Sequence, residues 1–210
     1  KAPLVVFLHG SGQSHDYVAH ANDPSADSLG PLLANQGGVT WVENAPEAAY
    51  VLVPQVPARD TKDAQGELGW RSADTQKLLL TLVDKLIAEN PGIDTSRLYL
   101  TGLSLGAMGS WKIITHPDPA ISRKFAAAAL FAGVTTMKVF APVAGETPAQ
   151  KQARQVDDVK SIDLSRVSIP LWLGHANTDP VVNRVGARVP FVQLTGKGDV
   201  DPAGEMTVAA

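Results

Sequence analysis

The sequence predicts a single α/β domain in which a mostly parallel sheet is built from repeated strand–loop–helix units. Short apolar runs closed by glycine, histidine or proline recur along the chain, as expected of strands covered on both faces. Stretches with helical spacing of apolar residues lie between these runs. The 210 residues, 44% hydrophobic and 19% charged, suit one domain with a substantial core, and no low-complexity linker divides them.

Five apolar runs are expected to form the strands of this sheet. In chain order they are LVVFLHG (4–10), AYVLVPQVP (49–57), RLYLTG (97–102), KFAAAALFAG (124–133) and IPLWLGH (169–175). A long polar loop, to about residue 38, follows the first run. The second run is stopped by Pro54 and Pro57, because proline cannot donate a hydrogen bond within a central strand.

Two helices are predicted with clear boundaries. Residues 73–89 follow Ser72, a suitable N-cap, and end at Asn90-Pro91-Gly92. Apolar side chains recur there at helical spacing: Leu79, Leu82, Val83, Leu86 and Ile87. Residues 105–115 form the second helix, directly after the third strand. The polar, alanine-rich stretch 137–168 is expected to be a helix or an insertion over the sheet.

Composition narrows the possible partners. The formal charge of −3 gives no electrostatic reason to expect nucleic acid or an anionic membrane surface. No apolar run approaches the roughly 20 residues of a bilayer-spanning helix, so no membrane span is expected. The chain has no cysteine, which excludes disulfides, thiol nucleophiles and thiolate metal sites. The absence of cysteine is compatible with a secreted or periplasmic protein but does not determine the compartment. Nothing in the sequence indicates the oligomeric state.

Ser104 is the strongest candidate for a nucleophile. It lies in GLSLG (102–106), a G-x-S-x-G pattern between the apolar run RLYLT and the helix that begins at 105. The bare motif is weak, but a nucleophile on a sharp strand-to-helix turn needs this placement, and side chains at the flanking glycines would collide. The helix directs its N-terminal N–H groups toward developing negative charge. The alternative is a glycine-lined strand–helix crossing with an inert serine.

The loop HGSGQ (9–13) is expected to supply an oxyanion donor. Acyl transfer needs two N–H groups for the tetrahedral oxyanion. The residue after the nucleophile, Leu105, provides one, and a glycine loop at a strand end provides the other. We assign the second donor to Ser11, with Gly12 as the near alternative; a simple turn is the competing interpretation. His9 is expected to organise this loop by hydrogen bonding rather than to take part in the chemistry.

Asp179 is the candidate for the orienting carboxylate of a catalytic triad. It follows the fifth apolar run, where an α/β site collects its residues, and it comes after Ser104 in chain order. The fourth run ends in LFAGV, without a carboxylate, which removes the commonest competing position. The alternative is that Asp179 and Pro180 only start a turn or cap a helix. His175 is expected to brace this loop rather than to act as general base.

Together these segments resemble the α/β-hydrolase superfamily. The motifs that carry the resemblance are PLVVFLHGSG, VLVPQVP, IDTSRLYLTGLSLGAMGSW and IPLWLGHANTDPVV, between residue 3 and about 182. More narrowly, they resemble carboxylesterases related to polyhydroxybutyrate depolymerases, feruloyl esterases and prolyl-oligopeptidase-like catalytic domains. The resemblance implies a mostly parallel sheet with helices on both faces.

It also implies hydrolysis of a small-molecule or polymeric ester through an acyl-serine intermediate, without a metal or organic cofactor. It places Trp70, in LGW, near the substrate cleft, with an ordinary core tryptophan as the alternative.

The sequence departs from the family pattern at the general base. The family places a histidine after the last strand, yet no histidine follows Asp179; the five histidines are His9, His15, His20, His116 and His175. We expect that this sequence stops before the last strand and the histidine loop, and that none of the five is the base. The alternatives are a non-catalytic binding module of the same fold and, within the enzyme hypothesis, a serine peptidase. His15 and His20 with Asp16 suggest a metal cluster only loosely.

Overall fold

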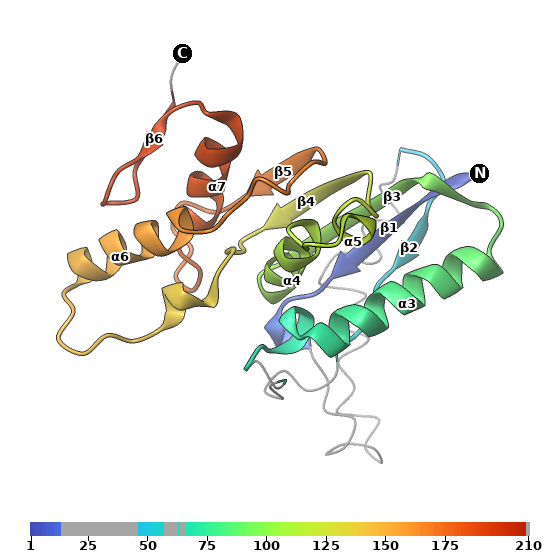
Figure 1. The fold of residues 1–210 in the computed structure, drawn as a ribbon, viewed down its shortest axis with the longest axis horizontal. Coiled ribbons are helices and arrows are strands. Elements are labelled where there is room, and N and C mark those ends of the chain that lie inside the picture. Colours follow the sequence, from blue (N-terminus) through green and yellow to red (C-terminus); the bar gives the residue numbers. More distant parts are fainter. Residues whose placement is uncertain (14–45, 57–62, 64–65, 209–210) are drawn as a thin grey trace.

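A five-stranded parallel sheet forms the centre of the molecule (Figure 1). The structure, a computed structural model, describes residues 1–13, 46–56, 63 and 66–208. The strands are β1 (Ala2–Leu8), β2 (Tyr50–Leu52), β3 (Ile93–Leu103), β4 (Ala127–Phe131) and β5 (Leu171–Gly174). Their spatial order is β2-β1-β3-β4-β5, and every neighbouring pair is parallel. The predicted mostly parallel α/β sheet is therefore confirmed.

All five expected strands are present, but their lengths differ from the apolar runs. β2 ends at Leu52, ahead of Pro54. β3 begins at Ile93, earlier than the apolar run, because Ile93 pairs with Ala2 at the start of β1. The pairing with β1 thus accompanies the early start of β3, and sequence periodicity does not contain that information.

Four longer helices accompany the sheet: α3 (Ala73–Glu89), α4 (Leu105–Ile114), α6 (Pro148–Lys160) and α7 (Val185–Thr195). Shorter helical turns are η1 (Ser11–Gln13), η3 (Gly69–Arg71), α5 (Pro119–Ser122) and η4 (Met137–Phe140). The stretch 137–168, expected to be a helix or an insertion, thus contains a helix, α6, which starts with a capping box between Thr147 and Gln150.

Two details of α3 differ from expectation. Ser72 occupies the N-cap position, but its hydroxyl makes no capping bond. The Ala73 N–H donates to Asp63 Oδ2 instead, at 3.1 Å. Leu82 is 39% exposed although it shares the helical apolar spacing, whereas Leu79 and Val83 are buried. The buried stripe of α3 is therefore narrower than the sequence pattern suggests.

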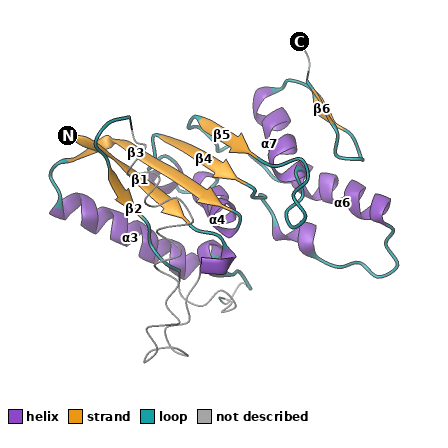
Figure 2. Cartoon of the chain, turned by 180° about the vertical axis from the view of Figure 1, so that it is seen from behind, coloured by secondary structure: helices purple, strands orange, loops and turns teal. Residues whose placement is uncertain are grey.

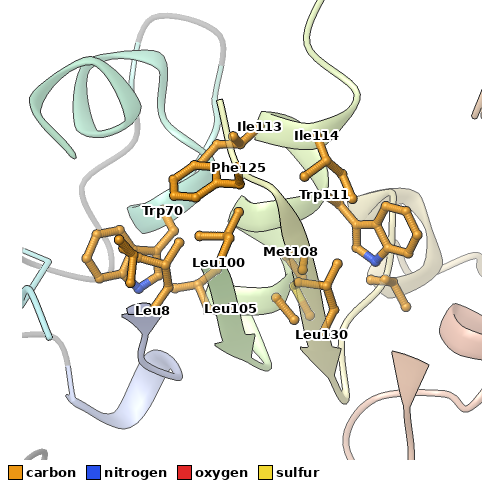
Figure 3. Packing of buried hydrophobic residues seen from close by; sticks show 14 of the residues in the cluster. Leu8, Trp70, Leu100, Leu105, Met108, Trp111, Ile113, Ile114, Phe125 and Leu130 are labelled. Carbon is orange, nitrogen blue, oxygen red and sulfur yellow. The ribbon is translucent and has the colours of Figure 1, made fainter. Parts of the chain in front are cut away.

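The core lies between the sheet and the helices α3 and α4, which lie on the same side of it in both views (Figures 1 and 2). Figure 3 shows how large side chains of α4, such as Trp111 and Met108, gather with Leu100 of β3 and Leu130 of β4. On α4, nine of the ten residues are buried. Such a helix is fixed along its whole length, and so is the turn from which it starts.

The C-terminal region forms a small hairpin apart from the main sheet. β6 (Asp199–Val200) and β7 (Met206–Thr207) pair antiparallel with each other. The strand β7, close to the C-terminus, therefore pairs with β6 and not with the main sheet. Within the described ranges, no helix has both the length and the apolar character needed to cross a bilayer.

Candidate active site

Ser104 occupies the sharp turn between β3 and α4. Its backbone has φ 52° and ψ −115°, a strained conformation for a residue with a side chain. The Ser104 N–H donates to the Phe131 carbonyl at 2.9 Å, which ties the turn to the end of β4. Among the described residues, the Ser104 hydroxyl has no hydrogen-bond partner. The backbone thus holds this hydroxyl at the carboxyl edge of the sheet.

The glycines on either side of Ser104 are required by contact distances. A Cβ added to Gly102 would lie 2.5 Å from the carbonyl carbon of Gly106. One added to Gly106 would lie 1.9 Å from the carbonyl oxygen of Leu8. Neither atom can move without shifting β1 or α4, so only glycine fits at these two positions. This is the steric reason that the sequence motif predicted.

The loop after β1 lies beside the serine. A Cβ built on Gly10 would be 3.7 Å from the Cβ of Ser104, so the two residues face each other across a van der Waals contact. Ser11 starts the η1 turn directly after Gly10. Leu105 is the first residue of α4, so its N–H has no partner in the helical ladder. Both proposed donor segments, η1 and the start of α4, therefore adjoin Ser104.

His9 anchors this loop from inside the core. Its side chain is fully buried, Nδ1 lies 2.6 Å from the Gly10 carbonyl, and Nε2 accepts the Val56 N–H at 3.0 Å. The imidazole must therefore carry its proton on Nδ1. Burial lowers the pKa of His9 below its ordinary value and outweighs the opposing hydrogen bond to Gly10. A neutral, doubly bonded His9 organises the loop as expected.

Trp70 is buried, with 3% of its surface exposed. Its Nε1 donates to the His9 carbonyl oxygen at 3.0 Å, and its ring meets the His9 ring edge-on, with centroids 5.1 Å apart. This position favours the alternative of a core tryptophan over a substrate contact.

Asp179 lies on the loop that follows β5, at the same edge of the sheet as Ser104. Its Oδ1 accepts the N–H groups of Val181 and Val182, both at 2.9 Å. Partial burial would raise the pKa of Asp179, but these backbone donors and His175 outweigh it and hold the pKa below its ordinary value. The carboxylate is therefore ionised at neutral pH and held in a fixed orientation.

His175 braces the Asp179 loop. Its Nε2 donates to the Val182 carbonyl at 2.8 Å and lies 3.3 Å from Asp179 Oδ2. Its Nδ1 is buried and has no hydrogen-bond partner among the described residues. Next to this loop a polar cavity of about 380 Å³ opens, with Asp179 and the α6 residues Lys151 and Gln152 among its walls. This cavity leaves space for a further group beside the carboxylate.

None of the described histidines is hydrogen-bonded to Ser104. Both ring nitrogens of His9 are bonded to the backbone, and His175 Nε2 is directed to the Val182 carbonyl and Asp179 Oδ2. His116 lies beyond the far end of α4, where its Nδ1 accepts the Asp118 N–H. His15, His20 and Asp16 lie outside the described residues. In the described part of the chain, no group of three or more His, Cys, Asp or Glu side chains is arranged to hold a metal.

The end of β4 also belongs to the site, although sequence reasoning did not single it out. Ala132 adopts φ 49°, and its N–H donates to the Gly174 carbonyl at 2.9 Å. A Cβ on the next residue, Gly133, would lie 2.5 Å from the Cβ of Ala107 in α4. The ends of β3, β4 and β5 are thus joined, from Ser104 to the Asp179 loop. In the sequence, the glycine that closes the fourth apolar run, Gly133, could have indicated this close approach to α4.

Comparison with solved structures identifies the fold. Esterase PE8 superposes with a TM-score of 0.53 over 92% of this chain and 77% of its own, at 18% identity. SOBER1 of Arabidopsis thaliana gives 0.52 over 93% and 85%, at 17% identity. Acylaminoacyl peptidase of Pyrococcus horikoshii gives 0.54 over 93% of this chain but 30% of its own, also at 17% identity.

No protein-family model and no curated protein matches the sequence. At these identities the superpositions establish architecture only. The chain has the α/β-hydrolase fold. Its structural neighbours in that fold include an esterase and a peptidase.

Proposed function

We propose that this protein is a serine hydrolase that cleaves carboxylic esters through an acyl-serine intermediate. The observation that carries the proposal is the strained backbone of Ser104, φ 52° and ψ −115°, between two glycines that admit no side chain. Strain of this kind costs about 1–3 kcal/mol and persists where the surrounding structure enforces it, which is typical of functional sites. The esterase among the structural neighbours supports the same activity.

In the proposed reaction, Ser104 Oγ attacks the acyl carbon of the ester and its proton passes to a general base. The N–H groups of Leu105 and Ser11, with Gly12 as the alternative to Ser11, stabilise the oxyanion. The alcohol leaves with a proton, and water then hydrolyses the acyl-serine. Asp179 would orient the base and balance its positive charge. We assign no histidine as that base.

A fluorophosphonate probe tests the nucleophile, because an activated serine displaces its fluoride and becomes phosphonylated. We expect one adduct, on Ser104, and hydrolysis of short p-nitrophenyl esters that Ser104→Ala lowers by several orders of magnitude. Ser165→Ala, on an exposed loop, is the control and should keep full labelling. Labelling of another serine, or near-normal turnover by Ser104→Ala, would refute the assignment.

One observation favours the alternative of a non-catalytic module with the same fold. None of the described histidines is hydrogen-bonded to Ser104, and the ring nitrogens that do form hydrogen bonds have other partners. A wild-type protein that folds but neither reacts with the probe nor hydrolyses esters would support that alternative. Comparing an ester with its matched amide would separate an esterase from a peptidase.

A further inference from the structure

Trp70 contacts both segments that carry the proposed oxyanion donors. Its indole N–H donates to the His9 carbonyl at 3.0 Å, immediately before the η1 loop. On the α4 side, a Cβ added to Gly109 would lie 2.4 Å from the Cβ of Trp70 and 2.8 Å from its carbonyl oxygen. Figure 3 shows the indole beside Leu8, at the end of β1, and Leu105. Trp70 therefore lies between the loop after β1 and the nucleophile helix.

Further contacts fix Trp70 against α4. Gln76 Nε2 donates to the carbonyls of Trp70, at 3.1 Å, and Gly109, at 3.3 Å, and so joins η3 to the helix. A Cβ on Gly69 would lie 2.8 Å from Leu105 Cδ2. The η3 turn is consequently packed against the first residue of α4 as well as against its middle.

We propose that Trp70 is a positioning residue that sets the separation between the two oxyanion donors, Leu105 on α4 and Ser11 on η1. This inference rests on the proposed function. The two N–H groups come from segments about 90 positions apart in the sequence and must converge on one oxygen, each at about 2.7–3.1 Å. A buried side chain bonded to one segment and packed against the other sets that separation directly. The indole thereby acts on the transition state without touching substrate.

Trp70→Phe tests the hydrogen bond. The substitution keeps an aromatic ring in the core and removes the donor to the His9 carbonyl. Deleting an oxyanion donor costs about 10²–10³ in kcat, so displacing one should cost less, roughly 10-fold. KM for the ester should change by less than about 2-fold, because the oxyanion forms only in the transition state.

Trp111→Phe is the matched control. Trp111 is 2% exposed, lies in the middle of α4, and its indole makes no hydrogen bond to any described residue. The control therefore loses a similar buried surface next to the same helix without releasing the η1 loop. If Trp70 matters only as packing, the two variants should lose stability and kcat to the same extent.

Amide hydrogen exchange adds a reading that does not depend on turnover. We expect Trp70→Phe to speed exchange and shift the NMR resonances of Ser11 and Gly12, while Trp111→Phe leaves them unchanged. Equal effects of the two variants on kcat and on these amides would overturn the proposal. Absence of hydrolysis in the wild type would instead refute the proposed function. In that case, faster exchange of the Ser11 and Gly12 amides in Trp70→Phe alone would still support the positioning role of Trp70. Unchanged exchange at these amides would refute that role.

Discussion

Gly106 lies so close to Leu8 that a Cβ added to the glycine would be 1.9 Å from the Leu8 carbonyl oxygen. The first turn of α4 and the end of β1 are therefore in backbone contact. This contact brings the start of the nucleophile helix next to the loop that follows β1. The proposed oxyanion site depends on that close approach.

Gly106→Ala should destabilise the protein by about 2–4 kcal/mol, because overpacking against backbone costs about 1–3 kcal/mol and here no flexible side chain can yield. Urea unfolding measures this directly. Gly10→Ala is the matched control for stability, since a Cβ there would meet nothing nearer than 3.4 Å. It should change stability by less than about 1 kcal/mol. Equal losses in the two variants would contradict the steric argument.

Ser104→Gly should be more stable than Ser104→Ala by roughly 1 kcal/mol. Both substitutions remove the hydroxyl, but glycine also relieves the strain of the positive φ, worth about 1–3 kcal/mol. Its greater freedom in the unfolded chain offsets about 0.5–1 kcal/mol of that gain. Thermal melts of the two variants supply the comparison. A less stable Ser104→Gly would show that the turn is not strained.

Asp179→Asn should lower kcat by about 10³–10⁴ while the fold is retained, because a triad base would lose its orienting and charge-balancing partner. Steady-state kinetics on a short ester measure the effect. Asp199→Asn and Asp201→Asn are the controls. Asp199 pairs with Lys160, and Asp201 accepts the Glu205 N–H. If kcat is nearly unchanged in Asp179→Asn but falls strongly in Asp199→Asn or Asp201→Asn, the orienting carboxylate is assigned to the wrong residue.

His9 should make stability depend on pH below neutrality. Its pKa in the fold is lowered from the ordinary value of 6.5, chiefly by burial, so the unfolded chain binds a proton more readily than the folded protein. The stabilising contribution of neutral His9 is therefore complete above pH 6.5 and is lost as pH falls from there toward the folded pKa.

Urea midpoints between about pH 8 and pH 5 test this. The wild type should lose stability on acidification, and His9→Gln should show a shallower slope. Parallel slopes for the wild type and His9→Gln would exclude His9 as the source.

The location of the site at the carboxyl edge could be predicted from sequence because it depends on local chemistry. GLSLG between an apolar run and a helix requires a tight turn, and the observed φ of 52° at Ser104 is the conformation that its glycines accommodate. The placement of Trp70 could not be predicted in this way. An indole N–H needs a partner when buried, but nothing in LGW shows that this partner is the His9 carbonyl.

The sequence by itself determined the parallel α/β class, the order of the five strands along the chain, and the boundaries of α3, because backbone propensity and apolar periodicity act over a few neighbouring residues. Only the tertiary structure decided which distant segments meet. It placed Gly10 against Ser104, His9 beneath the η1 loop, and Ala132 bonded to Gly174 between two strand ends. Contacts such as those of Ser104 and Ala132 join residues that are tens of positions apart, and they form only when the packed sheet and helices bring the chain segments together.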